Sequence, residues 1–186
     1  MVDFGGWEMP IEYPSKIVAE HLYTRHACSL FDVSHMGRVL VDGPEAVSFL
    51  QHVLSSNVSA LDLNQAQYAI IPNERGGAVD DAYLYRFEEE RFLLVVNAAN
   101  TDKDLAHLNE QIKAYDAKMT VITGDWAAIA VQGPKSKEIL QVLSGGKALT
   151  EPVKNALNTL QFEGHTVRVA KTGYTGEPLG YEVYIE

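Results

Sequence analysis

The stretch QYAIIPNERGGAVDDAYLYRF, residues 67–87, decides the fold of this chain. It contains two β-rich runs, 67–72 and 78–87, separated by five residues that end in Gly76-Gly77. Turn residues between two runs of this kind indicate a β-hairpin, and this is the best hairpin signal in the sequence. The hairpin therefore predicts an antiparallel sheet at the centre of the protein.

Side-chain alternation in the second run separates its two adjacent aspartates. Successive residues of a strand point to opposite faces, so Asp81 shares a face with Tyr83 and Tyr85, whereas Asp80 lies on the other face. Aspartate is disfavoured in strands, so two in succession need a reason. One interpretation is a carboxylate aimed into a ligand pocket beside aromatic walls. The other is an aspartate pair at a turn end, solvated or capping.

The segments around this hairpin continue the same pattern. Residues 1–14 are rich in Gly, Pro and aromatic residues and are expected to be irregular. Helices are expected at 15–28, from Pro44 onward, at 98–115 and from Pro134 to 143. Further strands are expected at 38–42, 91–97, 118–123, 126–131, 159–162, 166–171 and 181–185. Many strands joined by short turns, with few helices, predict an α+β fold of mainly antiparallel sheets with flanking helices.

A short internal echo joins the two halves of the chain. Val41-Asp-Gly-Pro recurs as Val131-Gln-Gly-Pro, 90 residues later. Each copy follows an expected strand and opens an expected helix. The echo predicts a duplicated strand–Gly-Pro–helix building block, although so short a match also arises by chance.

Composition excludes several classes of function. The 186 residues carry a formal net charge of −10, which disfavours nucleic acid and anionic lipid as partners. No apolar run reaches the ~18 residues that a membrane helix needs, and the opening residues do not resemble a signal peptide. The single Cys28 excludes a disulfide within the chain and is expected to be a small buried residue.

A second segment with chemical potential is KTGYTGE, residues 171–177, followed by Gly180-Tyr-Glu182. Glycines on both sides of Tyr174 indicate a tight loop that lets the backbone approach a ligand. The carboxylate of Glu182 can accept two N–H bonds from an amidine-like edge, such as that of a pterin ring. An ordinary glycine hairpin with a surface glutamate fits the pattern equally well.

Other polar groups carry weaker signals. Asp32, Ser34 and His35 are nearly adjacent, whereas a Ser-His-Asp triad normally joins separate segments, so His35 is expected to be structural. The histidines show no metal-ligand spacing, and no metal is expected. Segment 97–104 is expected to open a helix, with Asp102 and Asp104 near its positive end, while Asn97 at the strand end could face a ligand.

Taken in order, these segments resemble the glycine cleavage system T-protein family, the aminomethyltransferases. The matching stretches run from Met1 to Glu186: MVDFGGWEMPIEY, LFDVSHMG, NERGGAVDD, VVNAANTDKD, QGPKS, TGYTGE and the following GYE. Each motif is weak alone, but six in order are highly specific.

The resemblance implies an activity and its partners. The family transfers the methylene of an aminomethyl group, carried on the lipoyl arm of H-protein, to tetrahydrofolate. Ammonia is released, and 5,10-methylenetetrahydrofolate and dihydrolipoyl H-protein are formed. Tetrahydrofolate as co-substrate and lipoylated H-protein as partner are therefore expected, in the cytoplasm of a bacterium or the mitochondrial matrix of a eukaryote.

The resemblance also assigns roles to residues. Asp81 matches the key acid of the family, which orients the folate nitrogens and assists proton movement. Glu182 matches the glutamate that hydrogen-bonds the pterin, although Gly176-Glu-Pro-Leu-Gly-Tyr-Glu182 is one residue longer than the family pattern. The remaining pocket positions matched by this chain are Tyr68, Tyr85, Asn97 and Tyr174.

The family fold implies a domain organisation. Residues 38–124 are expected to form a compact α+β unit of ferredoxin-like type. Residues 1–37 and 125–186 are expected to form a discontinuous, antiparallel β-rich unit that completes the folate site. The later portion of the family, with its folate-contacting arginines and barrel-like domain, is absent from these 186 residues.

Two alternatives remain open at this point. The chain could be a folate-binding module without transferase activity, related to iron–sulfur assembly factors or to folate domains of sarcosine and dimethylglycine dehydrogenases. It could also be an inactive fragment, because half of a folate site leaves polar groups without partners.

A docking site for an acidic carrier should collect the few bases, such as Lys16, Arg25 or Arg38.

Overall fold

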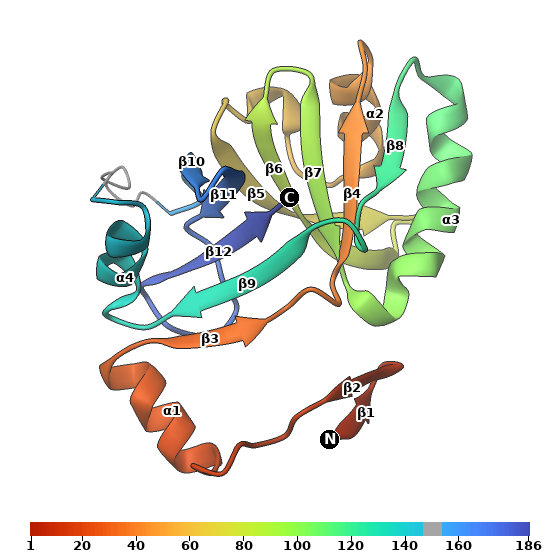
Figure 1. Ribbon diagram of the computed structural model, residues 1–186. Helices are drawn as coiled ribbons and strands as arrows, with labels where there is room; N and C mark the ends of the chain where they lie inside the picture. Colours follow the sequence, from red (N-terminus) through yellow and green to blue (C-terminus); the bar gives the residue numbers. More distant parts are fainter. Residues whose placement is uncertain (147–153) are drawn as a thin grey trace. The chain divides into compact units, whose positions relative to one another are not determined.

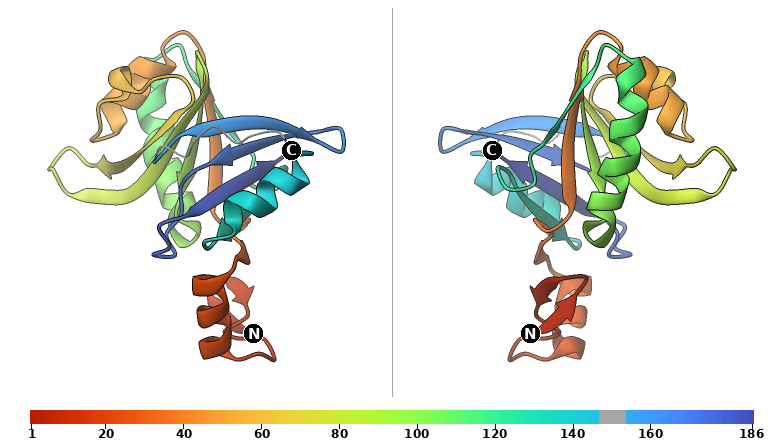
Figure 2. Two further views of the ribbon diagram at one scale, coloured as in Figure 1. Left: turned by 90° about the vertical axis from the view of Figure 1, so that its left-hand side faces the viewer. Right: turned by 90° about the vertical axis from the view of Figure 1, so that its right-hand side faces the viewer.

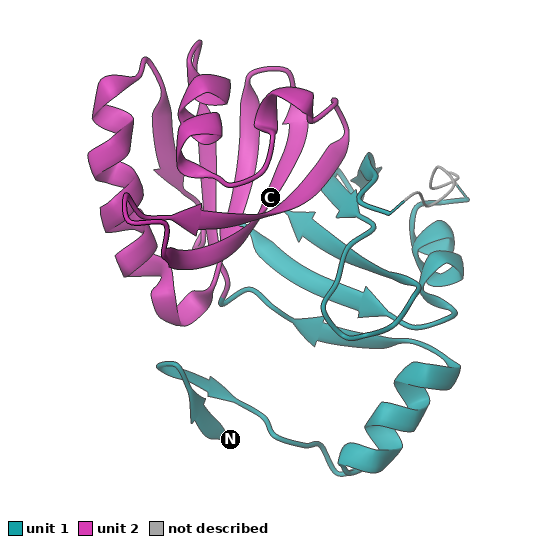
Figure 3. Cartoon of the chain, turned by 180° about the vertical axis from the view of Figure 1, so that it is seen from behind, with its two compact units in different colours: residues 1–35, 126–186 teal, residues 36–125 magenta. Residues whose placement is uncertain are grey.

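The computed structural model describes residues 1–146 and 154–186. The chain forms two compact units (Figure 3). Unit 1 consists of residues 1–35 and 126–186, and unit 2 of residues 36–125. The boundaries expected from the sequence, at 38 and 124, lie close to these. Among the described residues, no helix has the length and apolar character needed to cross a membrane.

Unit 2 is built on a five-stranded sheet in which every neighbouring pair is antiparallel (Figure 1). The strand order is β5-β6-β7-β4-β8. The strands are β4 (Gly37–Asp42), β5 (Gln65–Pro72), β6 (Ala78–Glu88), β7 (Arg91–Val96) and β8 (Lys118–Val121). The predicted hairpin is confirmed, because β5 and β6 pair along their length from Gln65↔Arg86 to Pro72↔Ala78.

One face of this sheet is covered by helices α2 (Ala46–Val53) and α3 (Thr101–Gln111) (Figure 2). Phe49 of α2 and Leu108 of α3 are fully buried in the same apolar cluster as Leu84 of the sheet. Short 3-10 turns, η1 (Val58–Ala60), η2 (Ala98–Asn100) and η3 (Ile112–Ala114), join these elements. The order β-α-β-β-β-α-β contains one strand more than the ferredoxin-like pattern.

Unit 1 has a second antiparallel sheet of five strands, ordered β10-β11-β12-β9-β3. The strands are β3 (Ser29–Asp32), β9 (Ala127–Gln132), β10 (Leu157–Phe162), β11 (His165–Ala170) and β12 (Gly180–Ile185). Helix α4 (Ser136–Leu143) places Leu140 in an apolar cluster with Val169 and Tyr181. Helix α1 (Ile17–His26) precedes β3. The predicted α+β fold with antiparallel sheets and flanking helices is therefore correct.

Near the amino terminus, one prediction is wrong and one strand was not predicted. Residues 1–14 are not wholly irregular, because β1 (Val2–Phe4) and β2 (Trp7–Met9) form a hairpin around Gly5-Gly6. Strand β3 is absent from the strands expected from the sequence. The sequence of β3, Ser29-Leu-Phe-Asp32, does not alternate between apolar and polar residues, and pairing with the distant β9 establishes it.

The two copies of the internal repeat, Val41-Asp-Gly-Pro and Val131-Gln-Gly-Pro, occupy equivalent positions in the two sheets. The series β4-α2-β5-β6-β7 and β9-α4-β10-β11-β12 follow the same order, and β4 and β9 occupy the same position beside an edge strand. Gly43 and Gly133 both have positive φ, 122° and 130°, where the chain turns from strand to helix. The topology thus supports a duplicated building block, with β8 and β3 as the differing edge strands.

Candidate functional site

The face of β6 that carries Asp81 lies on the opposite side of the unit 2 sheet from the helices. Ala82 and Leu84 belong to the apolar cluster beneath α2 and α3. Asp81 alternates with them and shares its face with Tyr83 and Tyr85, whose ring centroids lie 5.3 Å apart. The alternation predicted for the two aspartates is confirmed.

Tyr68 joins this face from the neighbouring strand. It pairs with Tyr83 across β5 and β6, with ring centroids 6.3 Å apart. Its hydroxyl interacts with the carboxylate of Asp81. Desolvation, together with this interaction and the charge of Asp81, raises the pKa of Tyr68. Tyr68 is 48% exposed and Tyr85 only 1%, so Tyr68 offers the accessible aromatic surface.

Asn97, at the end of β7, connects the two aspartates. Its side-chain amide Nδ2 donates to Asp80 Oδ1 at 3.0 Å and to Asp81 Oδ1 at 2.9 Å. The backbone carbonyl of Asn97 accepts from Thr101 Oγ1 at 3.1 Å, which anchors the residue to the start of α3. One amide therefore bridges the two faces of β6 and fixes the carboxylate of Asp81.

Sequence reasoning missed a buried partner of Asp80. Asp104, expected only to lie near the positive end of the helix, has a fully buried side chain that interacts with Asp80. The burial of Asp104 could have been predicted from its spacing to Leu108. Residues at i and i+4 share a helix face, and Leu108 lies in the core. Asp104 therefore belongs to the buried polar cluster behind Asp81.

Asp80 and Asp104 have opposite pKa shifts. Desolvation, followed by the hydrogen bond to Asp80 and its negative charge, raises the pKa of Asp104 to about 7. Desolvation would also raise the pKa of Asp80. Hydrogen bonds from Asp104, Asn97, the Asp81 backbone and Asn100 outweigh it and lower that pKa. Near neutral pH, Asp80 is thus the ionised member of the pair.

Glu182 lies on β12 in unit 1. Its side chain is buried, and Thr172 Oγ1 and Tyr184 Oη both donate to Oε2. The strand pairs Glu182 with Ala130 on one side and Ala170 on the other. The additional residue in the preceding loop therefore does not remove Glu182 from the sheet.

The loop before Glu182 carries Tyr174, which is 65% exposed. The buried amide of Gln132 holds this loop at three points. Nε2 donates to the carbonyls of Thr172 (3.3 Å) and Tyr181 (3.1 Å), while Oε1 accepts from Thr175 Oγ1 at 2.8 Å. A Cβ at Gly173 or Gly180 would overlap this amide, which explains the two glycines.

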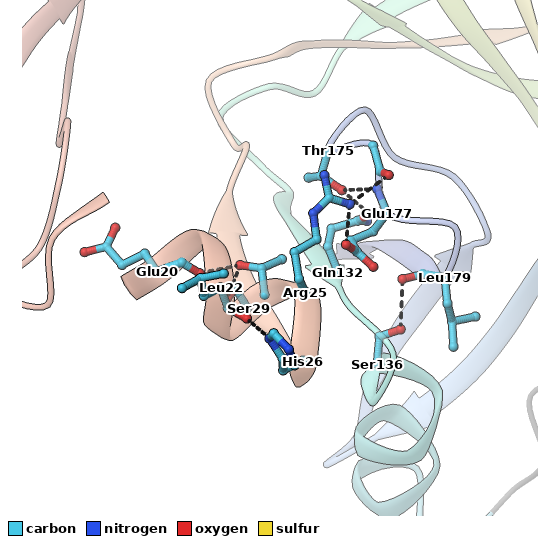
Figure 4. A network of polar contacts seen from close by, with 12 residues as sticks. Glu20, Leu22, Arg25, His26, Ser29, Gln132, Ser136, Thr175, Glu177 and Leu179 are labelled. Carbon is cyan, nitrogen blue, oxygen red and sulfur yellow. Dashed lines mark hydrogen bonds and ion pairs between the residues drawn. The ribbon is translucent and has the colours of Figure 1, made fainter. Parts of the chain in front are cut away.

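Arg25 of α1 holds the same loop from outside (Figure 4). Its guanidinium forms an ion pair with Glu177 and donates to the carbonyl of Gly176 at 3.0 Å. Arg38, by contrast, is fully buried and donates to the carbonyls of Met36 and Thr123. The expectation that Arg38 is available to a docking partner is therefore wrong.

The sequence Asp32-Val-Ser34-His35 has structural contacts. Asp32 Oδ1 accepts the backbone N–H of Ser34, and Ser34 Oγ accepts the N–H of Ala128. The ring of His35 packs near Phe4 and Trp7, with centroids 6.4 and 6.0 Å away. Cys28 is buried, as expected, and burial raises the pKa of its thiol. No group of possible metal ligands occurs among the residues that the structure describes.

The six residues expected at the site thus fall into two groups. Unit 2 brings Tyr68, Asp81, Tyr85 and Asn97 to adjacent strands of one sheet. Unit 1 carries Tyr174 and Glu182 on a clamped loop and the strand that follows it. Each group is ordered by hydrogen bonds within its own unit.

Comparison with known proteins places this geometry in a family. Residues 1–186 match the family described as the GCVT N-terminal domain. The chain is 46% identical over 185 residues to an aminomethyltransferase of Thermus thermophilus, covering 100% of this chain and 52% of that protein. An aminomethyltransferase of Deinococcus deserti is also 46% identical, over 190 residues, with 51% of that protein covered. The chain spans about half the length of these curated relatives.

Solved structures agree with this assignment. The glycine cleavage system aminomethyltransferase T from Bartonella henselae matches with a TM-score of 0.88 and 34% identity, over 98% of this chain and 48% of that one. A heterotetrameric sarcosine oxidase from Corynebacterium matches with a TM-score of 0.61 and 15% identity, which shows a shared fold alone.

Proposed function

The chain belongs to the GCVT N-terminal domain family, and we propose that it is the folate-binding part of an aminomethyltransferase of the glycine cleavage system. The parent protein transfers the methylene of the aminomethyl group on the lipoyl arm of H-protein to tetrahydrofolate and releases ammonia. The catalysed reaction belongs to that parent, because this chain covers about half of its relatives.

The observation that carries the proposal is the setting of Asp81. Its carboxylate is partly buried on a face that it shares with three tyrosines, is held by Asn97 and interacts with Tyr68. A carboxylate has about four lone-pair sites, so it can accept further N–H groups from a ligand. A fixed acceptor on an aromatic face suits the flat, nitrogen-rich ring system of tetrahydrofolate.

Within this proposal the site residues have distinct roles. Asp81 orients the reacting nitrogens of the folate and assists the movement of a proton as the amine leaves. Tyr68 supplies exposed aromatic surface, and Asn97 holds the carboxylate. The buried Tyr85 supports the ring of Tyr83. Tyr174 and Glu182 contribute pocket surface and a pterin hydrogen bond.

Calorimetric titration of this chain with tetrahydrofolate tests the binding role. Asp81→Asn keeps the shape of the side chain and removes its charge. Loss of one charge-assisted hydrogen bond, about 1.5–3 kcal/mol, corresponds to binding that is roughly 10- to 100-fold weaker. Asp62→Asn is the matched control, because Asp62 is an exposed acid of the same unit. Equal affinity of wild type and Asp81→Asn would contradict the role of Asp81.

The transfer step is tested in the full-length protein with lipoyl-aminomethyl H-protein. Formation of methylenetetrahydrofolate and release of ammonia are followed together. Asp81→Asn is expected to reduce turnover by orders of magnitude without unfolding the protein. Binding of tetrahydrofolate without any transfer would identify a folate-binding module instead.

A further inference from the structure

We propose that Asp104 is a positioning residue that shares a proton with Asp80 and, through Asn97, sets the orientation of the Asp81 carboxylate. The consequence for folate chemistry depends on the proposed function. The shared proton itself does not, because it follows from the packing of unit 2.

The first step of the argument is the burial of Asp104. Its side chain has 0% exposure, and among the described residues no N–H or O–H donor reaches either of its carboxyl oxygens. The ammonium of Lys103 lies 3.9 Å from Oδ1 but donates its hydrogen bond to the carbonyl of Val79 at 2.7 Å. An ionised carboxylate in this position would be buried without adequate compensation.

The second step is the neighbour of Asp104. The carboxyl group of Asp80 interacts with that of Asp104, and Asp80 Oδ2 is itself buried with no donor among the described residues. Two carboxylates can only accept, so a hydrogen bond between them requires one proton. The other charged or titratable groups close to this pair are Lys103 on α3 and Asp81 on β6. Protonated Asp104 donating to ionised Asp80 satisfies both buried groups.

The third step leads to Asp81. Asn97 directs the N–H groups of one amide toward Asp80 and Asp81. This arrangement requires Asp80 to be an acceptor in a fixed position. When Asp104 loses its proton, repulsion between the two buried carboxylates displaces Asp80. The amide of Asn97 then reorients, and Asp81 loses its anchored geometry.

A carboxyl-carbon NMR titration of this chain tests the inference without any ligand. Aspartate is labelled with ¹³C at the carboxyl group, and the side-chain amide of Asn97 is followed by ¹⁵N–¹H spectra from about pH 4 to about pH 9. The variants are Asp104→Asn, which keeps a donor that cannot titrate, and Asp104→Leu, which removes the donor. Asp102→Asn is the control, because Asp102 is exposed on the same helix.

In the wild type and in Asp102→Asn, Asp104 is expected to titrate near pH 7, and the carboxyl carbon of Asp80 and the Asn97 amide resonances should report that step. In Asp104→Asn the step disappears, and Asn97 keeps its low-pH wild-type resonances throughout. In Asp104→Leu the step also disappears, but Asn97 is displaced at every pH. If Asp104 only filled space in the core, the Asn97 amide resonances would be the same in Asp104→Asn and Asp104→Leu.

Three results would overturn the inference: a wild type without a step near neutral pH, Asn97 resonances that ignore the step, or identical Asn97 resonances in both variants. The wild type alone decides the first two, so the inference stays testable if Asp104→Leu does not fold. Failure of tetrahydrofolate to bind would refute the proposed function but leave this titration unchanged. A flat titration would refute proton sharing but leave folate binding by Asp81 intact.

Discussion

Asp80 and Asp81 show how adjacent identical residues acquire different chemistry. They point to opposite faces of β6, so Asp80 enters a buried cluster with Asp104 while Asp81 lies beside tyrosines. The amide of Asn97 donates a hydrogen bond to both of them. The difference between the two carboxylates therefore comes from strand geometry and from the buried proton behind them.

At the same scale, the raised pKa of Asp104 predicts how the stability of the protein depends on pH. Its pKa is raised from about 3.9 in the unfolded chain to about 7 in the folded protein. The folded state therefore binds more protons between these values. The stability that protonated Asp104 confers is complete below about pH 4 and is lost as pH rises through about 7. Asp104→Asn should remove up to about 1.4 kcal/mol per pH unit from the slope of the unfolding free energy in this range.

Urea unfolding of wild type and Asp104→Asn at several pH values measures that slope. The difference between the two proteins cancels contributions from groups unaffected by the substitution. The low-pH stability of the wild type should decline toward, or below, that of the variant as Asp104 ionises. Parallel curves from about pH 4 to about pH 8 would show that Asp104 has an ordinary pKa.

At the scale of elements, the loop between β11 and β12 depends on a close approach. Gln132 of β9 occupies the space that side chains at Gly173 and Gly180 would need. Arg25 of α1 holds the outer part of the same loop. The exposed Tyr174 is therefore carried on a segment anchored from two elements, which makes its position a property of unit 1 as a whole.

Gly180→Ala is expected to destabilise the protein by about 1–3 kcal/mol, because the added methyl group displaces the hydrogen-bonded Gln132 amide. In a Gln132→Ala background the same change should cost at least ~1 kcal/mol less, since the clash is gone. Denaturant unfolding of the four proteins gives this coupling. Gly124→Ala is the control, because a Cβ there meets open space. Additive effects of the two substitutions would show that the methyl group at position 180 and the Gln132 amide do not compete for the same space.

At the scale of the whole molecule, unit 2 is inserted into unit 1. Its two ends lie together, because Ile122 donates its N–H to the carbonyl of Arg38 at 2.9 Å and Arg38 donates its own to Thr123 Oγ1 at 3.0 Å. The main apolar cluster, from Val39 to Leu108, lies entirely within residues 36–125. The insertion therefore closes on itself and has a core of its own.

Residues 36–125 expressed alone are consequently expected to fold. Cooperative thermal unfolding by circular dichroism and dispersed amide NMR spectra would show this. Leu108→Ala, at the centre of the cluster, should lower the unfolding free energy of the segment by about 2–5 kcal/mol. A segment with neither a cooperative transition nor dispersed spectra would show that unit 2 depends on unit 1.

Much of this architecture could be predicted because it is local. Alternation and turn residues are enough to indicate β5, β6 and the separation of Asp80 from Asp81. Helix positions follow from apolar spacing and from Gly-Pro signals. The strands β1 and β2 were hidden in a segment rich in Gly and Pro, and β3 does not alternate between apolar and polar residues. All three are established by pairing with their partners.

The sequence by itself determined the α+β class, the central hairpin, the family resemblance and the face on which Asp81 lies, since each depends on neighbouring residues or ordered motifs. Only the tertiary structure decided that Asp104 packs against Asp80 and that Arg38 is buried. It alone also revealed that Gln132 fills the space left by two glycines. Those features depend on contacts between distant segments. Burial and hydrogen-bond partners, which set the ionisation of a carboxyl group, exist only once those segments meet.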